Sequence, residues 1–235
     1  MFPFLLIILI AAGCASQENS LEKVKGVDVT YNEYFKPFDQ LDERKNIQFY
    51  KPIAIEEIRS SLDEQIWSAG NGIASDALPF EVDEEQAYLV TSKEEMGEVK
   101  NQVQLSYMGN SEYGDVDSFF IISVTEVGEN PIKEYDFPEV VDSVGNELKK
   151  EILIDNVPIF QQVLTTDSAL LYRYYKYNEA EKKVTVVGTA ANEFYSYYDG
   201  FVYHIGYSID REKNTAQVQE DMLNLTRKFI LDNDL

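Results

Sequence analysis

Cysteine and histidine are almost missing from this chain of 235 residues, which holds one of each. A single cysteine excludes a disulfide within the chain. With one histidine, any zinc site or serine–histidine pair would have to use His204. The sequence also holds no Gly-rich phosphate loop, no GxSxG, no HExxH and no CxxC. These absences point away from thiol, zinc and nucleotide chemistry, and we expect no cofactor and no bound metal.

Basic residues are scarce relative to acidic ones. The chain has 20 Lys and Arg against 42 Asp and Glu, which gives a formal net charge of −22. A field of this sign repels phosphate backbones and anionic lipid headgroups, so nucleic acid is not an expected partner. Solubility alone can explain the excess, and attraction of cations or of a basic partner is the alternative.

Long hydrophobic runs are absent too, because the longest one, Phe2 to Ala12, has 11 residues. A membrane-spanning helix needs about 20 residues. Eleven residues instead suit the apolar core of a secretory signal peptide, which is commonly about 7–15 residues long. Small residues follow the run and lead directly to Cys14.

The segment Ala11-Ala12-Gly13-Cys14 resembles the lipobox of bacterial lipoproteins, although Ala11 stands where a larger aliphatic residue is usual. The resemblance implies a signal peptide over residues 1–13 and a diacylglycerol or palmitate lipid on Cys14. It also implies attachment to the outer face of the cell membrane, since two acyl chains suffice for stable anchoring. The alternative is an N-terminal core helix with a buried cysteine.

After Cys14 we expect a polar tether over 14–26, an N-terminal extension over 27–74, and an α+β domain over 75–233. The spacing of Ile55, Ile58, Leu62 and Ile66 predicts a helix over 55–67 in the extension. The spacing of Val218, Met222, Leu225 and Phe229 predicts a second helix over 215–231, with Asn214 or Thr215 as its N-cap.

Between the two helices the composition is typical of strands, with alternating aromatic and β-branched residues. An Asp199-Gly200 turn separates two aromatic runs and predicts a tight hairpin. The predicted strands are 86–92, 101–109, 117–127, 147–156, 169–178, 182–190, 193–200 and 201–209.

We therefore expect an α+β fold, in which an antiparallel sheet packs against the C-terminal helix and the N-terminal helix. The order of LPFEV (78–82), VQLSYMG (103–109), a strand pair, YYDGFVYHIGYS (197–208) and a closing helix resembles a family of uncharacterised lipoproteins of Gram-positive bacteria. That resemblance, over residues 75–233, implies a domain similar in outline to the PsbP-like fold. It implies no activity.

The most suggestive cluster for ligand binding is YRYYKY at 172–177. Alternation along a strand places Tyr172, Tyr174 and Lys176 on one face, and Arg173 with Tyr175 and Tyr177 on the other. The tyrosines can stack on sugars or peptide side chains, and Arg173 and Lys176 can bind anionic groups. Packing of the same rings against the strand 193–200 is the structural alternative.

The other candidates have simple structural explanations. In the strand 201–209 the residues Phe201, Tyr203, Ile205 and Tyr207 share the core face, so we expect His204 on the wetter face. Acidic residues are abundant, and a glycosidase needs two carboxylates that face one cleft. The acidic candidates are Asp83, Glu84, Glu85, Glu94, Glu95, Asp115, Asp117, Glu139 and Asp142.

Taken together, the sequence predicts a membrane-anchored extracytoplasmic lipoprotein that binds an unknown envelope protein or polymer without catalysis. Its candidate ligand residues are Tyr172, Arg173, Tyr174 and Lys176, and its lipidation site is Cys14. The alternative is a hydrolase that acts on cell-envelope polymer through paired carboxylates.

Overall fold

The structure is a computed structural model, and it describes residues 21–26, 46–58, 62, 72–93, 99–111, 115–136, 141–142, 145–165 and 172–231. Cys14 and the predicted signal peptide lie outside the described residues, as do most of the predicted helix 55–67 and the acidic residues Glu94, Glu95 and Glu139.

Strands dominate the described part of the chain, which has 54% of its residues in strands and 14% in helices. The strands are β1 (Lys23–Gly26), β2 (Gln48–Tyr50), β3 (Glu84–Lys93), β4 (Val99–Asn110), β5 (Val116–Glu126), β6 (Glu147–Ile154), β7 (Val157–Val163), β8 (Tyr172–Asn178), β9 (Lys183–Thr189), β10 (Asn192–Tyr198) and β11 (Phe201–Ser208). The helices are α1 (Ile55–Ile58), the 3₁₀ turn η3 (Ser75–Ala77) and α3 (Ala216–Leu231).

All these strands belong to one 11-stranded sheet with the order β6-β7-β10-β11-β5-β4-β3-β2-β1-β9-β8. Neighbouring strands are antiparallel except β1 and β9, which pair in parallel through two residue pairs. The sheet is therefore mixed, and the β8–β9 hairpin is joined to the rest of the sheet by the pairing of β9 with the short strand β1.

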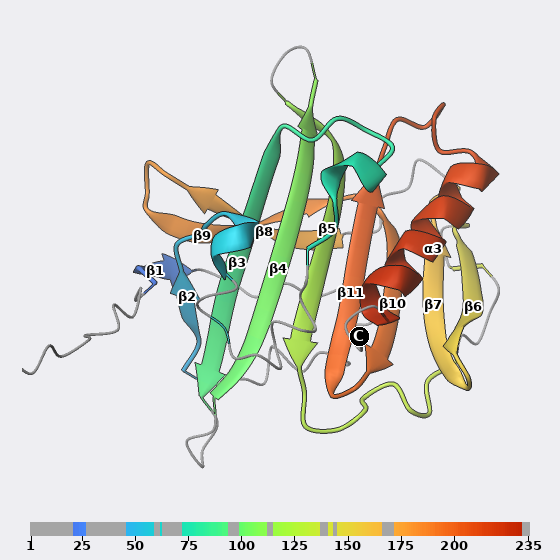
Figure 1. The fold of residues 1–235 in the computed structure, drawn as a ribbon, viewed down its shortest axis with the longest axis horizontal. Coiled ribbons are helices and arrows are strands. Elements are labelled where there is room, and N and C mark those ends of the chain that lie inside the picture. Colours follow the sequence, from blue (N-terminus) through green and yellow to red (C-terminus); the bar gives the residue numbers. More distant parts are fainter. Residues whose placement is uncertain are drawn as a thin grey trace, which may run out of the picture.

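The front face of the sheet carries the main apolar core. Helix α3 lies across β10 and β11 in Figure 1, and α1 and η3 cover the β3–β5 side of the same face. The face that we expected to be the core face of β11 is confirmed, because Phe201, Tyr203, Ile205 and Tyr207 are buried in one cluster with Met222, Leu223, Phe229 and Ile230 of α3. Burial of this apolar surface is the main stabilising term for the front layer.

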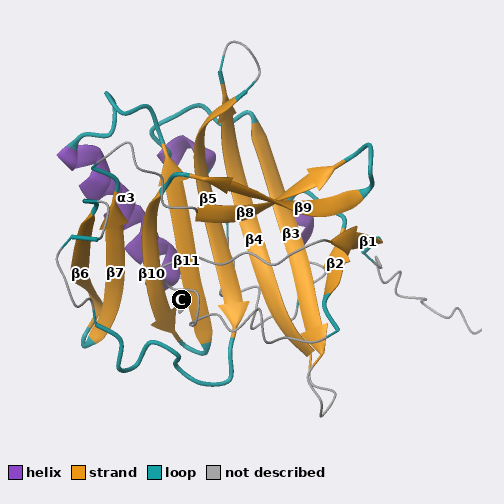
Figure 2. Ribbon diagram, turned by 180° about the vertical axis from the view of Figure 1, so that it is seen from behind, coloured by secondary structure: helices purple, strands orange, loops and turns teal. Residues whose placement is uncertain are grey.

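The rear face is covered by strands instead of a helix. The β8–β9 hairpin crosses β3, β4 and β5 on the side away from α3, as the front and rear views show (Figures 1 and 2). Its side chains form two apolar clusters with the sheet, one around Phe119 and Tyr172 and one around Phe49 and Tyr175. One end of the sheet thus folds back as the second layer of the protein.

Local sequence signals explain two boundaries. Asp199 and Gly200 both have positive φ, 46° and 86°, which suits the tight turn that joins β10 to β11. Thr215 precedes α3, and its Oγ1 accepts the Val218 N–H at 3.4 Å, so Thr215 is the N-cap.

The predicted α+β fold, PsbP-like with a helix at each end, is wrong. The described residues form a mostly β protein with one long helix, α3, and the predicted N-terminal helix is seen only as the single turn Ile55–Ile58. The reason is that β1, β2 and β7, which we did not predict, extend the sheet, and that the β8–β9 hairpin takes the place of a covering helix. Lys23–Gly26, within the predicted tether, is part of this sheet.

Candidate functional site

A polar layer lies between the rear face of the sheet and the β8–β9 hairpin. It consists of side chains from four neighbouring strands that are all buried: Gln102, Gln104, Ser106, Ser123, Thr125, Glu193 and His204. Because burial of unpaired polar groups is costly, such a layer must be hydrogen-bonded internally. Gln102 donates to Thr125 Oγ1 at 3.1 Å, and Gln104 donates to Ser106 Oγ at 2.8 Å.

Strand β8 is the last strand of the sheet, and its unpaired edge faces this polar layer. The backbone N–H and C=O groups of that edge therefore need hydrogen-bond partners from the side chains of the layer. Gln104 does so for Tyr175, because its Oε1 accepts the Tyr175 N–H at 2.7 Å and its Nε2 donates to the Tyr175 carbonyl at 3.1 Å. Tyr175 Oη in turn donates to Gln102 Oε1 at 2.7 Å. The Tyr177 N–H donates to Tyr88 Oη at 3.2 Å. Side chains of β3 and β4 thus replace the missing neighbour strand of β8.

His204 and Glu193 form a buried pair at the other end of the polar layer. His204 Nε2 lies 2.7 Å from Glu193 Oε2, and the two residues are 4% and 1% exposed. Burial raises the pKa of the Glu193 carboxyl, while the hydrogen bond and charge of His204 act in the opposite direction. The Tyr172 ring covers the pair, with its centroid 5.0 Å from that of the imidazole.

The expectation that His204 lies on a wetter face is wrong. His204 does point away from the front core, but the hairpin buries the rear face at this position. The Tyr172 ring can pack directly on the sheet because the residue beneath it is Gly206, which has no side chain. A Cβ atom at this position would lie 2.5 Å from the tyrosine ring. The histidine is therefore part of the packing between hairpin and sheet.

A groove opens beside the hairpin where the polar layer ends. Its floor is a pair of adjacent strands in register, with Glu84 opposite Met108 and Gln86 opposite Ser106. Tyr88 closes the inner end of the floor. The remaining lining residues are Val116 of β5 and Tyr174 and Lys176 of β8. The groove is shallow and open, and its space of about 310 Å³ includes solvent outside the protein surface.

The lining residues divide into a buried interior and an exposed mouth. Tyr88, Ser106, Met108 and Tyr174 are buried, whereas Glu84 and Lys176 are exposed. Tyr88 Oη donates to Gln86 Oε1 at 2.7 Å, which holds that amide with its Nε2 as a remaining donor. Burial raises the pKa of Tyr88 and of Tyr174, so both phenols are neutral hydrogen-bonding groups at physiological pH.

The predicted ligand cluster is divided by the hairpin. Tyr174 and Lys176 line the groove, and Tyr172 lies on the same side of β8 but deeper, packed on Phe119 with ring centroids 6.0 Å apart. Arg173 alternates to the opposite side of the strand, together with Tyr175. The tyrosine rings pack against aromatic rings of β3 and β5, and Tyr172 also covers His204 of β11 and its partner Glu193 in the strand 193–200.

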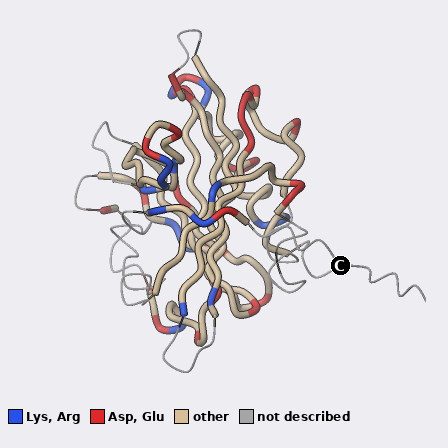
Figure 3. Tube along the Cα trace, turned by 90° about the vertical axis from the view of Figure 1, so that its left-hand side faces the viewer, with Lys and Arg blue, Asp and Glu red and all other residues tan. Residues whose placement is uncertain are grey.

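Among the acidic candidates that the structure describes, Glu84 alone lines the groove. Asp142 is buried and accepts hydrogen bonds from the Asn146 N–H at 2.9 Å and from Gln162 Nε2 at 2.8 Å, which is a structural role. Many of the other Asp and Glu residues occupy turns and strand ends (Figure 3). In the part of the chain that the structure describes, no group of three or more His, Cys, Asp or Glu is placed to hold a metal ion.

Sequence reasoning missed Gln86, Ser106 and Glu193. A signal for Ser106 was present, since Gln102, Gln104 and Ser106 alternate with Val103, Leu105 and Tyr107 along one strand. Alternation shows that such residues share a face, but only the hairpin on that face makes it a site.

No family model matches the chain, and comparisons with curated proteins and with solved structures found no match either. None of the helices in the described ranges is long and apolar enough to cross a lipid bilayer. The assignment of a function therefore depends on the groove and on the sequence of the N-terminal segment.

Proposed function

We propose that this protein is a lipid-anchored, non-catalytic binding module on the outer face of a bacterial membrane, and that the groove beside the β8–β9 hairpin is its ligand site. The observation that carries the proposal is the lining of the groove, which combines buried aromatic walls with a few hydrogen-bonding groups. Binding sites for small molecules in proteins have this composition.

The anchor is proposed from the sequence Ala11-Ala12-Gly13-Cys14, which lies outside the described residues. A lipid on Cys14 would tether the groove to the membrane surface, where it meets envelope proteins or fragments of envelope polymers. Radiolabelled palmitate is expected to enter the wild-type protein and not the Cys14→Ala variant. Label in both proteins, or in neither, would contradict the anchor.

The alternative function is that of a hydrolase with paired carboxylates. Glycoside hydrolysis needs two carboxyl groups about 5–10 Å apart across one cleft. The described lining of the groove contributes one carboxylate, Glu84, so the groove supports binding better than this chemistry.

The binding site can be tested by blocking it. We suggest saturation-transfer difference NMR on the full chain in detergent, with neutral sugars, amino acids and dipeptides at millimolar concentration. At least one class is expected to give a signal. Gln86→Trp, which fills the floor of the groove, should remove that signal, whereas Gln217→Trp on the exposed surface of α3 should keep it.

If no class gives a signal, or if the signal survives Gln86→Trp, the groove is not the ligand site. Thermal melts of both variants, followed by circular dichroism, are the check that a lost signal reflects a blocked groove and not an unfolded protein.

A further inference from the structure

The mouth of the groove carries one charge of each sign, from two different elements. Glu84 begins β3 and Lys176 lies on β8, and both are exposed. Neither side chain forms an ion pair or hydrogen bond with any residue that the structure describes, although several lysines elsewhere do pair with acids, such as Lys100 with Glu126 at 3.3 Å. Both charges are therefore available to a ligand.

The interior offers hydrogen-bond donors behind these charges. Gln86 Oε1 is occupied by the Tyr88 hydroxyl, which leaves the Gln86 NH₂ group without a partner in the described part of the chain. Ser106 Oγ accepts from Gln104, so its own O–H is free to donate. Both groups are donors, and a carbonyl oxygen is the acceptor that they suit.

Met108 and Val116 complete the lining with apolar surface, and Tyr174 adds an aromatic ring. The groove thus presents a carboxylate, an ammonium group, two hydrogen-bond donors suited to a carbonyl oxygen, and a small apolar area along one open surface. An acidic ligand would be repelled by Glu84 and by the net charge of −22, and a cation alone would leave Lys176 unused.

Resting on the proposed function, we infer that the ligand of the groove is a short zwitterionic peptide, such as a dipeptide with both termini free. Glu84 pairs with its ammonium group, Lys176 pairs with its carboxylate, and Gln86 Nε2 and Ser106 Oγ donate to its peptide carbonyl.

The test compares glycylglycine with two capped forms, N-acetyl-glycylglycine and glycylglycine amide, and with N-acetylglucosamine as a neutral ligand. The assay is a ligand-observed NMR titration of the full chain in detergent. Exposed ion pairs have small energies, so each cap is expected to weaken binding by about two- to fivefold.

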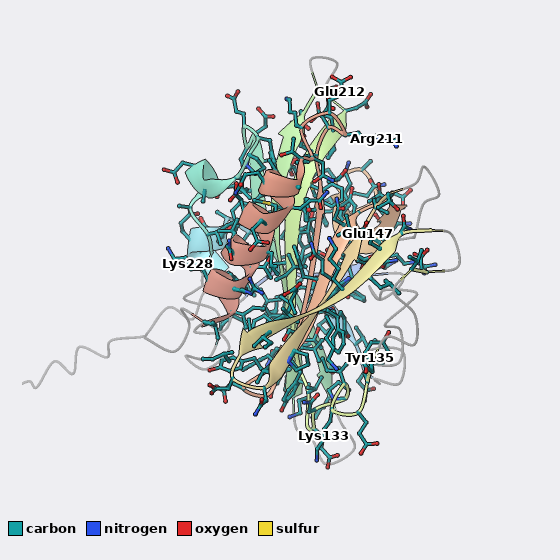
Figure 4. The ribbon with its side chains drawn as sticks, turned by 90° about the vertical axis from the view of Figure 1, so that its right-hand side faces the viewer. Lys133, Tyr135, Glu147, Arg211, Glu212 and Lys228 are labelled. Atoms are coloured by element: carbon teal, nitrogen blue, oxygen red, sulfur yellow. The ribbon has the colours of Figure 1, made fainter. Side chains whose placement is uncertain are left out.

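Charge-removing variants identify the partner of each terminus. Lys176→Gln should abolish the difference between glycylglycine and its amide, and Glu84→Gln should abolish the difference between glycylglycine and its N-acetyl form. Lys133→Gln and Glu134→Gln are matched controls in the loop after β5, at the opposite end of that strand from Val116, and Lys133 is labelled in Figure 4. Both controls should leave every affinity unchanged.

Equal affinity for glycylglycine and its capped forms would overturn the inference, as would differences that persist in Lys176→Gln and Glu84→Gln. If N-acetylglucosamine binds and the peptides do not, the inference of a zwitterionic peptide ligand is wrong, while the proposal that the protein is a binding module is supported. If no probe in this set or in the wider panel binds, both proposals fail together.

Discussion

Replacement of His204 by alanine tests whether the buried pair with Glu193 joins the hairpin to the sheet. In the variant, Glu193 keeps its burial but loses the 2.7 Å hydrogen bond and the charge that oppose the rise of its pKa. Removing one partner of a buried ion pair typically costs about 3–5 kcal/mol of unfolding free energy. A domain has only about 5–15 kcal/mol in total, so the effect will be easy to measure.

The expected cost depends on pH, and the direction follows from the Glu193 carboxyl. Its pKa is already raised by burial and will be higher without His204, so at a pH between the unfolded and folded pKa values the folded variant binds a proton that the unfolded chain releases. Stability linked to this proton is present below the unfolded pKa and is lost as pH rises towards the folded pKa. The penalty of His204→Ala should therefore be smaller at pH 5 than at pH 8.

Urea unfolding followed by circular dichroism at pH 5 and pH 8 measures this difference. The control is the same His204→Ala change made in a Glu193→Gln background, because neither protein then carries the titrating carboxyl and the penalty between them should be similar at both pH values. A penalty of His204→Ala that is equal at the two pH values, or larger at pH 5, would refute the argument and assign His204 a role in packing alone.

Two further substitutions test the contacts between hairpin and sheet. Gly206→Ala places a Cβ atom 2.5 Å from the ring of the fully buried Tyr172, so we expect the unfolding free energy measured in urea to fall by about 1–3 kcal/mol. The control Gly128→Ala, with no atom within 4 Å of its Cβ, should lower it by less than half as much. Equal losses in the two variants would contradict the close packing of Tyr172 on Gly206. Gln104→Leu leaves the N–H and C=O of Tyr175 without their side-chain partner, which should lower the unfolding free energy by about 1–3 kcal/mol for each group. Amide hydrogen exchange at Tyr175 should become faster. Unchanged exchange would show that Gln104 does not hold the edge of β8.

Much of the secondary structure could be predicted from local patterns. Strand-like composition and the turn residues between segments correctly predicted eight strands, from β3 to β11 except β7, and the Asp199-Gly200 turn placed β10 beside β11. The apolar stripe with Thr215 at its start predicted α3 to within a residue. These features depend on residues close together in the chain, so local propensity and local hydrogen bonds decide them.

Strand β7 was missed because its sequence, VPIFQQV, contains Pro158 and two polar residues. Pro158 lies opposite Ile152 of β6, where a missing N–H is tolerated, and the Arg227 side chain donates to the Ile152 carbonyl at 3.1 Å. Short strands such as β1 and β2 form because other strands pair with them, so their own sequences contain no pattern that predicts a strand.

The β8 side of the groove could be predicted from the sequence, but its β3–β4 floor could not. Alternation put Tyr174 and Lys176 on one side of their strand, but the floor depends on the register of β3 against β4, which brings Gln86 opposite Ser106. That a strand hairpin crosses this floor depends on the pairing of β9 with β1, more than 150 positions away in the chain. No periodicity within either segment encodes that pairing.

The amino-acid sequence by itself determined eight of the strands, where α3 begins, and that β11 has an apolar face and a more polar one. Only the tertiary structure decided that the more polar face is buried. Both faces of the central strands are covered, one by α3 and one by the β8–β9 hairpin, and the position of the hairpin results from contacts between distant segments. For this reason His204 is buried while Lys176, on the hairpin itself, remains exposed at the mouth of a groove.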